Sequence, residues 1–427
     1  MRIAYVIINA NRHEGTSRAV LEVAERLAGV HRVDIWARTF EATRDQVADR
    51  GTTNGDAVFH DKLNLQRIAG PGRPEIADFG SFKLVADRRL KTARYDIIHS
   101  AGPNTSLADV YTIQTVHSVK VAQLSEVRKT SSAGLLRRLS WRLYDGAVLR
   151  AERDAYQTFG PRGPKLFLPV SVGTRDELIA CYPDIQANCE NSLVDYPLRG
   201  FDPIAVIPNG ADLDLFHPRQ RERFRSEVRQ KHGFRDDDFI ILFSGGDWRR
   251  KGLDLLLYAI TMLRDDGVRL LVVGDDRNGN EIRSMVDKLE LASRVTFAGF
   301  RKDVHRYYAA GDLFVFPTSY EAFSLATIEA AASGLPVVMT PASGAVDLLG
   351  SGDCGAIVSR DPHSIAEQIR VYRRNPELLA KHGANARAKA ERDYSWDGIA
   401  KQTLGVYERL IEYRKAMSRS VQLGQGR

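Results

Sequence analysis

The chain has few cysteines, no long apolar run and no GxGxxG motif. Its three cysteines among 427 residues show no CxxC spacing and no paired histidines, so we predict neither a disulfide framework nor a zinc site. No apolar stretch approaches the roughly 18 residues that a membrane-spanning helix needs. Without GxGxxG after the first apolar run, a nicotinamide-dependent dehydrogenase is disfavoured. That run is followed by no small-residue cleavage site, which predicts a cytoplasmic protein.

Length and pattern predict a two-domain α/β protein. A chain of 427 residues exceeds the size of a single core, and 43% hydrophobic with 27% charged residues is typical of a soluble globular protein. Apolar runs alternate with helical patterns, as in doubly wound parallel sheets with crossover helices. The predicted strands are 1–8, 31–37, 95–101, 110–117, 165–171 and 204–207 in the first half, and 239–244, 269–273, 294–297, 313–317, 335–340 and 356–359 in the second.

A segment dense in turn residues, Pro208 to Gln220, separates the two halves. Ligands of open parallel sheets bind outside the carboxyl ends of the strands, so two such domains facing one another would each supply one ligand. We predict an amino-terminal domain over 1–207, a carboxyl-terminal domain over 208–390, a terminal helix over 391–415 and a disordered tail over 416–427.

The net charge of +7 predicts an anionic partner, and much of the excess lies in one tract. Between Arg128 and Arg153, seven basic residues stand against two acidic ones, with leucines, Trp141 and Tyr144 among them. A basic amphipathic helix on an anionic membrane surface has this composition. A core-facing helix with a basic outer face has it as well.

Two carboxylates lie at a predicted strand-to-helix joint in the second half. Glu321 and Glu329 follow the apolar run ending at Thr318, and the helix is predicted to start at Phe323 and Ser324. The N–H groups of a helix start suit a phosphate, and carboxylates accept hydrogen bonds from sugar hydroxyls. At the helical rise the two carboxylates would lie about 10 Å apart and grip opposite ends of a sugar nucleotide. Ordinary acids on a solvated helix are the alternative.

Two other joints have phosphate-binding features. Gly15 and Thr16 precede the first predicted helix, where bare backbone can approach a phosphate closely. After the strand at 239–244, the glycines of SGGDWRRKG come before Arg250 and Lys251 at the head of a predicted helix. Cations at the positive end of a helix are expected where an anion binds, so both side chains are candidates for holding a diphosphate. A solvated basic turn is the alternative.

Two further candidates flank one first-half strand. His117 at the end of the strand 110–117 would donate to or position a transferring group, unless it is a structural histidine. Asp109 before the strand would orient an acceptor hydroxyl or cap a turn. The acidic triplet 236–238 directly precedes a buried strand, which is typical of a solvated loop, so no metal is expected there.

Together these residues resemble the retaining glycosyltransferases of the GT-B fold over nearly the whole chain. The resemblance is carried by the Glu321 and Glu329 pair, by Lys251 with the following glycine, and by VIPNGADLDLF (206–216), VVGDD (272–276) and YSWDGIAKQTLGVYERL (394–410). It implies two facing Rossmann-like domains, with the terminal helix crossing back to the first. The loop GGDWRRKG is similar to that of the lipopolysaccharide core glucosyltransferases.

The resemblance also implies residue roles. Glu329 would bind the ribose, Glu321 the donor sugar, and Arg250 and Lys251 the diphosphate, together with the amides around Phe323. Charge on the leaving diphosphate would then be stabilised electrostatically.

Arg301, after the strand RVTFAGF, would lie near the base, and His117 near the reacting carbon. The implied reaction is front-face transfer without a metal or cofactor, from a nucleotide sugar for which UDP-glucose is the leading expectation. A glycan or lipid-linked acceptor such as lipopolysaccharide core would place the protein peripherally on the inner face of the cytoplasmic membrane.

Three other functions stay open, of which a phosphorylase is disfavoured because no lysine context typical of a PLP site is recognisable. An NDP-sugar epimerase of the same fold would convert the donor without an acceptor. A nucleic-acid-binding protein would use the basic charge, but it leaves the glutamate pair and both loop-to-helix joints unexplained, so no nucleic acid is expected as a partner.

Overall fold

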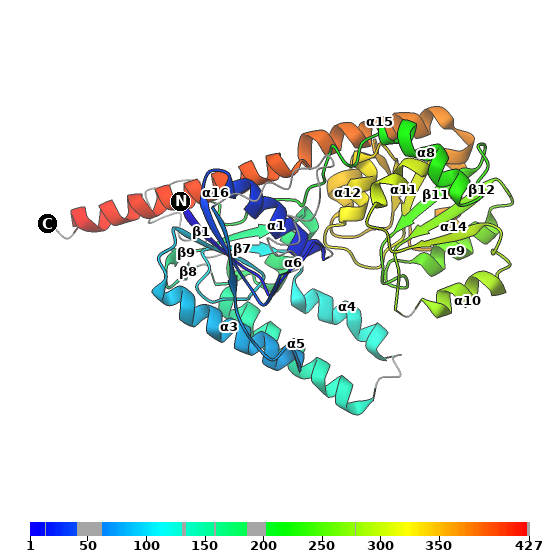
Figure 1. Cartoon of the computed structure of the whole chain (residues 1–427). Helices are drawn as coiled ribbons and strands as arrows, with labels where there is room; N and C mark the ends of the chain where they lie inside the picture. The colour runs from blue at the N-terminus through cyan, green and yellow to red at the C-terminus, as the bar shows by residue number, and fades with distance from the viewer. Residues whose placement is uncertain are drawn as a thin grey trace. The chain divides into compact units, whose positions relative to one another are not determined.

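The computed structural model describes residues 1–12, 14–40, 62–129, 134–157, 159–185, 202–277 and 279–424. They form two compact units, one comprising Met1–Pro208 with Asp397–Arg427 and the other comprising Asn209–Trp396. Each unit has a parallel sheet of six described strands, with helices on both faces (Figure 1). The predicted α/β class with two doubly wound sheets is therefore confirmed. No helix in these described segments is long and apolar enough to cross a membrane.

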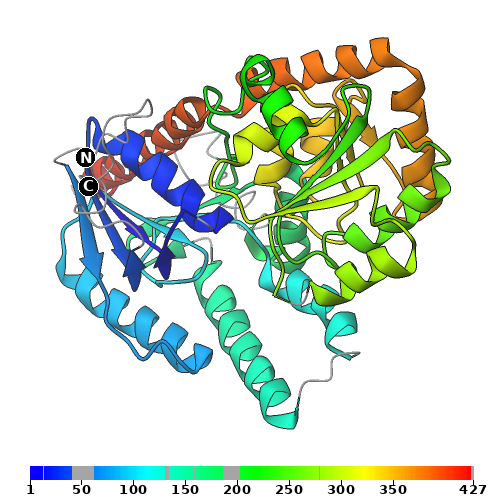
Figure 2. The ribbon, with the colours of Figure 1, turned by 45° about the vertical axis from the view of Figure 1, so that its right-hand side comes forward.

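The first sheet has the strand order β10-β7-β6-β1-β3-β5, and the order reverses between β1 and β6 as in dinucleotide-binding folds. Its helices α1 and α16 lie on one face, and α3 and α5 on the other (Figure 2). The described elements of this unit are β1 Arg2–Val6, β2 Asn9–Ala10, α1 Gly15–Ala28, β3 Arg32–Ala37, β4 Thr39–Phe40, β5 Leu63–Arg67, α3 Glu75–Thr92, β6 Ile97–Ala101, β7 Val110–Ile113, α4 His117–Lys129, α5 Leu135–Ala155, β8 Phe159–Gly160, β9 Gly163–Pro164, β10 Leu166–Pro169, α6 Val172–Cys181 and, from Asp397 onward, α16 Trp396–Gly424.

Alternation along the strands of the first sheet separates an apolar layer from a polar one. Ala4 belongs to the apolar cluster that includes Phe82 of α3. The neighbouring Tyr5 points to the opposite face, where its hydroxyl lies 2.7 Å from that of Tyr407 in α16. The Tyr407 hydroxyl also lies 2.5 Å from Nδ1 of His99, and burial lowers the pKa of His99 to about 3. A neutral, buried hydrogen-bond network thus holds α16 on this sheet.

Some boundaries of the first unit differ from the prediction. Strand β5 was not predicted because its sequence LNLQR lacks an apolar alternation, and it pairs with β3 at the sheet edge. The predicted strand 204–207 is reduced to an isolated bridge between Phe167 and Ile204. Helix α16 continues to Gly424, since neither glycine nor proline interrupts residues 411–423, so most of the expected tail 416–427 is helical. Residues 425–427 lie outside the described residues.

The second sheet has the order β13-β12-β11-β14-β15-β16, and its order reverses between β11 and β14. Helices α9, α10 and α14 lie on one face of it, and α8, α11, α12 and α15 on the other (Figure 1). The described elements of this unit are α8 Gln220–Lys231, β11 Phe239–Ser244, α9 Leu253–Met262, β12 Val268–Val273, α10 Asn280–Lys288, β13 Val295–Gly299, α11 Val304–Ala310, β14 Leu313–Phe316, α12 Leu325–Ala332, β15 Val337–Met339, α13 Ala345–Leu349, β16 Gly355–Ile357, α14 Pro362–Arg374 and α15 Pro376–Asp393.

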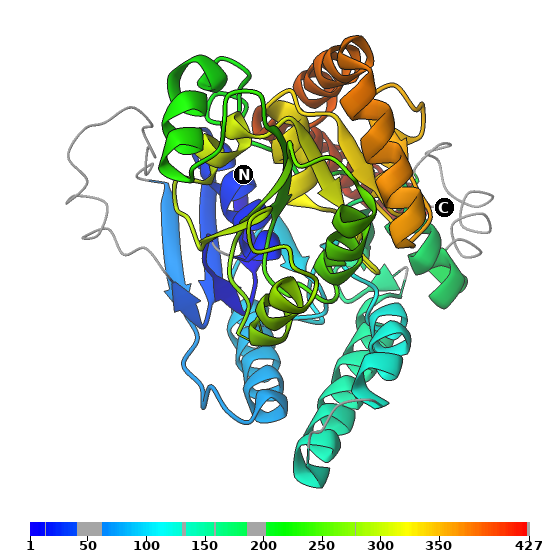
Figure 3. The same ribbon diagram turned by 90° about the vertical axis from the view of Figure 1, so that its right-hand side faces the viewer.

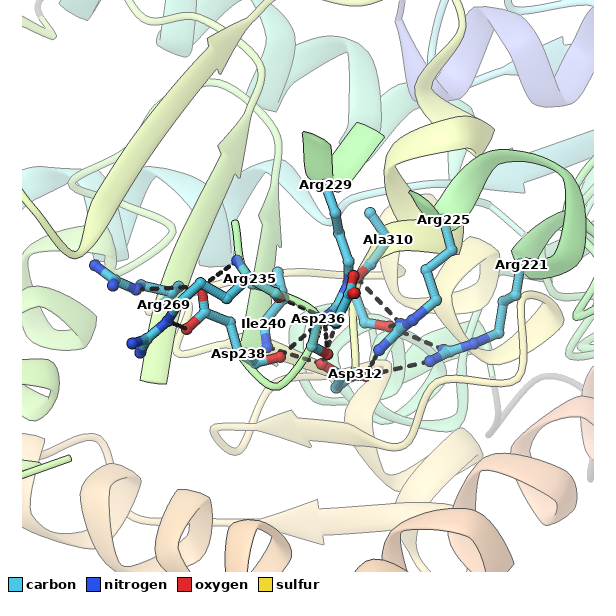
Figure 4. Close-up of polar contacts among 11 residues, drawn as sticks. Arg221, Arg225, Arg229, Arg235, Asp236, Asp238, Ile240, Arg269, Ala310 and Asp312 are labelled. Carbon is cyan, nitrogen blue, oxygen red and sulfur yellow. Dashed lines mark hydrogen bonds and ion pairs between the residues drawn. The ribbon is translucent and has the colours of Figure 1, made fainter. Parts of the chain in front are cut away.

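An arginine cluster fastens α8 to this sheet (Figure 4). Arg221, Arg225 and Arg229 recur every four residues and place their guanidinium groups 3.2, 2.6 and 2.7 Å from the carboxylate of Asp312. The same carboxylate accepts a hydrogen bond from the backbone N–H of Ile240 at 2.8 Å. Because Asp312 precedes β14, the cluster lies at the amino end of the strands, away from the edge where such sheets bind ligands.

Candidate functional site

Glycines shape the loops at the carboxyl end of β11. Gly245 and Gly274 have φ values of +135° and +115°, and a Cβ on Gly274 would lie 2.5 Å from the Gly245 carbonyl oxygen. Gly252 has φ +79° and caps α9, where a Cβ would lie 2.0 Å from the Pro317 carbonyl oxygen. Arg250 and Lys251 therefore lie in a turn packed against the end of β14. The prediction that they head the helix is wrong, because the left-handed Gly252 delays the helix start to Leu253.

Arg250 joins the loops after β11 and β14. Its Nε donates to Asp247 Oδ2 at 2.5 Å, and its Nη1 donates to the Tyr320 carbonyl at 2.6 Å. Nη1 also lies 3.5 Å from Oε2 of Glu321, so the two residues form an ion pair. In the other direction, the Arg250 carbonyl accepts a hydrogen bond from the Ser319 N–H at 2.8 Å. Two of the predicted donor-site residues are thereby brought into direct contact.

Lys251 is a half-buried cation within the same cluster. Among the described residues, its Nζ has no hydrogen-bond acceptor, and it lies 5.3 Å from the ring centroid of Phe316. Burial lowers the pKa of Lys251, whereas the carboxylates of Glu321 and Glu329 act to raise it. A cation beside two carboxylates, with no protein acceptor among the described residues, can pair with an anionic ligand at this position.

Helix α12 begins where the sequence predicts. Ser324 is its N-cap and accepts a hydrogen bond from the Thr327 N–H at 3.2 Å, and the first turn contains no acidic residue. The preceding Phe323 is buried, and its ring centroid lies 5.8 Å from that of Tyr394. The positive end of the helix thus lies at the carboxyl end of β14, where it favours negative charge.

Glu329 lies inside α12 and is only 6% exposed. The hydroxyl of Tyr308 in α11 donates to its Oε2 at 3.2 Å. A buried carboxylate needs such a donor, and this one orients the Glu329 side chain.

Arg301 follows β13, at the edge of the sheet and two strands away from β11. Its guanidinium carbon lies 5.5 Å from the ring centroid of Tyr307, and its buried Nε has no hydrogen-bond partner among the described residues. The structure therefore leaves Arg301 apart from the cluster of Arg250 and Lys251, along the same carboxyl edge of the sheet.

In the first unit, His117 begins α4 and does not end β7, which stops at Ile113. The backbone N–H of His117 donates to Glu152 Oε1 at 3.0 Å, and its Nε2 lies 3.2 Å from Asp145 Oδ1. Burial raises the pKa of Glu152 to about 7. The histidine is buried and held by two carboxylates of α5, at the carboxyl end of the strands.

Asp109 does not lie near His117. It precedes β7 at the opposite end of the strands, where Oδ2 accepts from the Ile98 N–H at 2.7 Å. Its Oδ1 accepts from Arg162 Nε at 2.9 Å and from Arg414 Nη2 at 2.5 Å. This buried carboxylate pairs with two arginines that tie α16 and the β8-β9 hairpin to the sheet, and its suggested role toward an acceptor stays a prediction.

Gly15 and Thr16 form the first turn of α1, after β1 and the short β2. This turn contains no acidic side chain, and the N-cap residue Glu14 makes no side-chain cap. The N-terminus of α1 thus has the polarity for an anion, as predicted, but it belongs to the first unit, whereas the other predicted donor-binding residues belong to the second.

The basic tract 128–153 is not one helix. It begins in the last residues of α4 and continues in α5, while residues 130–133 lie outside the described residues. Figure 3 shows the amino-terminal end of α5 extending away from the sheet. Leu135, Leu139 and Leu143 are 83%, 51% and 51% exposed there and recur every four residues, as on one helical face. This exposed end is apolar as well as basic, since Arg137, Arg138 and Arg142 are also exposed.

In the described segments, no group of three or more His, Cys, Asp or Glu residues could hold a metal ion. In the acidic triplet 236–238, Asp238 accepts from the Arg235 N–H at 2.8 Å and lies 3.5 Å from Arg269 Nε.

Sequence reasoning missed Asp145, Glu152 and Tyr308, which hold the candidate side chains. The first two are seven residues apart on α5, a spacing that places both on one helical face and is visible in the sequence. Their common partner is visible only in the folded chain.

Comparison with known proteins places both halves of the chain among glycosyltransferases. Residues 13–186 match Glycosyltransferase Family 4, and residues 224–389 match Glycosyl transferases group 1. The chain is 29% identical over 232 residues to the MMP alpha-(1->4)-mannosyltransferase of Mycolicibacterium hassiacum, covering 53% of each chain. It is 30% identical over 172 residues to the lipopolysaccharide glucosyltransferase WaaG of Escherichia coli, covering 40% of this chain and 46% of WaaG. The matches span about half the length of these curated relatives.

Solved structures show the same fold. A crystal structure of WaaG superposes with a TM-score of 0.70 at 22% identity, covering 94% of this chain and 98% of WaaG. HepE of Anabaena, solved in complex with UDP and glucose, superposes with a TM-score of 0.67 at 19% identity, covering 96% and 99%. With a family 4 domain followed by a group 1 domain, the chain belongs to the GT-B glycosyltransferases. Among them it resembles WaaG in sequence and in fold.

Proposed function

We propose that this protein transfers a sugar from a nucleoside diphosphate sugar to an acceptor. The observation that carries the proposal is Lys251, whose Nζ lacks an acceptor among the described residues while lying within the electrostatic reach of Glu321 and Glu329. A diphosphate beside Lys251 and the start of α12 would supply that acceptor. The sugar and ribose hydroxyls would then donate to Glu321 and Glu329.

The proposed reaction is front-face transfer with retention of the anomeric configuration. As the glycosidic bond breaks, negative charge grows on the leaving diphosphate, which takes the proton of the acceptor hydroxyl. Arg250, Lys251 and the backbone N–H groups around Phe323 would stabilise this charge, so we further propose that no metal is needed. Rates unchanged by excess EDTA are expected, and a loss restored by a divalent cation would overturn this part.

UDP-glucose is the proposed donor. Two observations on other proteins support it: HepE was solved with UDP and glucose, and the relative WaaG is a glucosyltransferase. The mannosyltransferase relative leaves mannose as the competing sugar. Because Glu321 is the residue proposed to face the sugar, it is the position at which this choice should be tested.

Thermal unfolding in the presence of UDP, GDP and ADP sugars tests the donor proposal. A ligand that binds the folded state at 100 times its Kd stabilises it by about 2.7 kcal/mol. We expect stabilisation by UDP-glucose that is lost in Lys251→Met and kept in Arg249→Met. Stabilisation by none of the donors would refute the sugar-nucleotide site.

An NDP-sugar epimerase is the second candidate, because the same fold serves that reaction. Incubation with the donor alone distinguishes the two. Conversion of the donor sugar without an acceptor would favour the epimerase, whereas donor consumption that depends on an added glycan or lipid-linked acceptor, such as lipopolysaccharide core, is expected for the transferase.

We also propose that the exposed amino-terminal end of α5 docks on an anionic membrane surface, at the inner face of the cytoplasmic membrane. Leu135, Leu139 and Leu143, which are exposed, would enter the interface while Arg137 and Arg138 contact lipid headgroups.

Sedimentation with vesicles tests this docking. Binding to vesicles of phosphatidylglycerol and phosphatidylethanolamine at low salt is expected, with loss on replacing the three leucines by serine. Val30→Ser is the matched control, because Val30 is 74% exposed in the same unit. Failure to bind anionic vesicles, or equal binding by the triple variant, would refute the docking surface.

A further inference from the structure

Two carboxylates of α5 converge on the first residue of α4. Glu152 Oε1 accepts the backbone N–H of His117 at 3.0 Å, and Asp145 Oδ1 lies 3.2 Å from the ring Nε2 of the same residue. Since the carboxylates are seven residues apart, they stand two turns apart on one face of α5. Glu152 contacts the backbone of His117, and Asp145 contacts its ring.

Both carboxylates are buried, and burying a carboxylate costs free energy unless hydrogen bonds or ion pairs compensate the loss of water. Glu152 is 1% exposed and Asp145 is 6% exposed. The second oxygen of Glu152 accepts the hydroxyl of Tyr182 at 2.8 Å, so both of its oxygens have donors. Breaking either hydrogen bond would leave a buried carboxylate oxygen without a donor, which costs free energy. Both contacts are therefore held in place.

The contact made by Glu152 also suits the place where it occurs. His117 opens α4, whose first N–H groups have no partner within the helix and carry partial positive charge. A carboxylate at this position is favoured by the dipole and fixes where α4 starts. Because α4 follows β7 by three residues, fixing its start fixes the position of His117 at the carboxyl edge of the sheet.

The contact made by Asp145 sets the chemistry of the ring. An ionised carboxylate only accepts hydrogen bonds, so Nε2 of His117 carries the hydrogen in this pair. The pair thereby selects one tautomer and one ring orientation. The ring is also edge-on to Tyr144, with centroids 6.2 Å apart, which limits its rotation.

We propose that Asp145 and Glu152 are positioning residues for His117. His117 in turn acts on a substrate that binds at the carboxyl edge of the first sheet. Glu152 holds the backbone and Asp145 holds the ring in a single tautomer. This inference rests on the proposed glycosyl transfer, and it adds α5 to the catalytic apparatus.

Steady-state transfer kinetics of the full chain test the proposal. We expect His117→Ala and Asp145→Asn each to lower kcat by about 10- to 100-fold with little change in the donor KM, because orientation at the reacting centre is lost while donor binding is kept. Asp154→Ala is the matched control, since Asp154 is an exposed carboxylate on the same helix. Its kcat should stay within about 2-fold of the wild type.

The double variant His117→Ala/Asp145→Asn separates positioning from general support of the fold. If Asp145 acts through His117, the double variant loses no more kcat than His117→Ala alone. Glu152→Gln is expected to keep most of the activity, because its amide oxygen can still accept the N–H of His117. Glu152→Ala is expected to match His117→Ala. Multiplied losses in the double variant, or wild-type kcat in Asp145→Asn, would overturn the proposal.

A spectroscopic measurement keeps this inference distinguishable from the proposed function. The imidazole nitrogen shifts of His117 in the wild type should report a single tautomer with hydrogen on Nε2, and Asp145→Asn should shift that nitrogen toward the average of both tautomers. A wild type that transfers no sugar would refute the proposed function and leave this result standing. An averaged tautomer in the wild type would refute the positioning role.

Discussion

Replacing Lys251 by methionine should change activity and stability in opposite directions. Methionine keeps most of the side-chain volume and its contact with the ring of Phe316, but it removes the positive charge. The structure places that charge beside Glu321 and Glu329 without a hydrogen-bond acceptor among the described residues. The charge therefore makes no hydrogen bond within the described fold, and we propose that it serves a ligand.

The expected loss of activity follows from the proposed role at the leaving group. Removing one preorganised group that stabilises developing negative charge costs about 100- to 1,000-fold in kcat, or about 3 to 4 kcal/mol. The stability effect has the opposite sign. Burial lowers the pKa of Lys251, so the folded state disfavours its charge at neutral pH, where the unfolded chain carries the same charge in water. The variant should unfold at equal or higher denaturant concentration than the wild type.

Initial transfer rates at saturating donor and urea unfolding at pH 7 measure the two effects on one preparation. Arg249→Met is the matched control, because it removes a positive charge two residues away. Arg249 pairs with Glu281 at 3.0 Å and both side chains are about 70% exposed, so the control should change kcat by less than about 2-fold. Near-normal turnover of Lys251→Met, or an equal loss in Arg249→Met, would refute the diphosphate assignment.

Three further variants test parts of the structure. Burial raises the pKa of Glu152 from 4.5 to about 7, so the contribution of this group to stability is fully present below pH 4.5 and is lost as the pH rises through 7. Between pH 5 and 8, the free energy of unfolding of Glu152→Gln should therefore rise by up to about 2.5 kcal/mol relative to that of the wild type. A difference in urea unfolding that stays constant over this pH range would contradict this. Tyr407→Phe leaves Nδ1 of His99 and the Tyr5 hydroxyl without this partner and should cost about 1 to 3 kcal/mol, so an effect below about 0.5 kcal/mol would show that α16 is held otherwise. Gly252→Ala forces a Cβ toward the Pro317 carbonyl and should cost about 2 kcal/mol or more together with activity, whereas wild-type unfolding and turnover would show that the turn is not required.

Features encoded in local patterns were predictable. The strand β11 is a continuous apolar run, and the start of α12 follows from a serine with an N-cap preference ahead of a helical pattern. Glu321, Glu329, Arg250 and Lys251 were assigned from loop-to-helix joints and from the family resemblance. The structure brings them together because parallel strands end at a common edge.

Features that depend on distant partners were not predictable. Asp109 was predicted to orient an acceptor hydroxyl or cap a turn, and its pairing with Arg414, which is 305 residues away, was not foreseen. Strand β5 has no apolar alternation of its own, and its place follows from pairing with β3. The late start of α9 depends on a close approach of Gly252 to Pro317 that no sequence window contains.

The sequence by itself determined the α/β class, the two halves and the residue types at the ligand edge, because strand periodicity, caps and loop composition act over a few residues. Only the tertiary structure decided which charges pair with one another. Arg250 contacts Asp247, Tyr320 and Glu321, and Asp109 contacts two arginines, whereas Lys251 has no hydrogen-bond acceptor among the described residues. Pairing of charges depends on distances between segments remote in sequence, and only folding sets those distances.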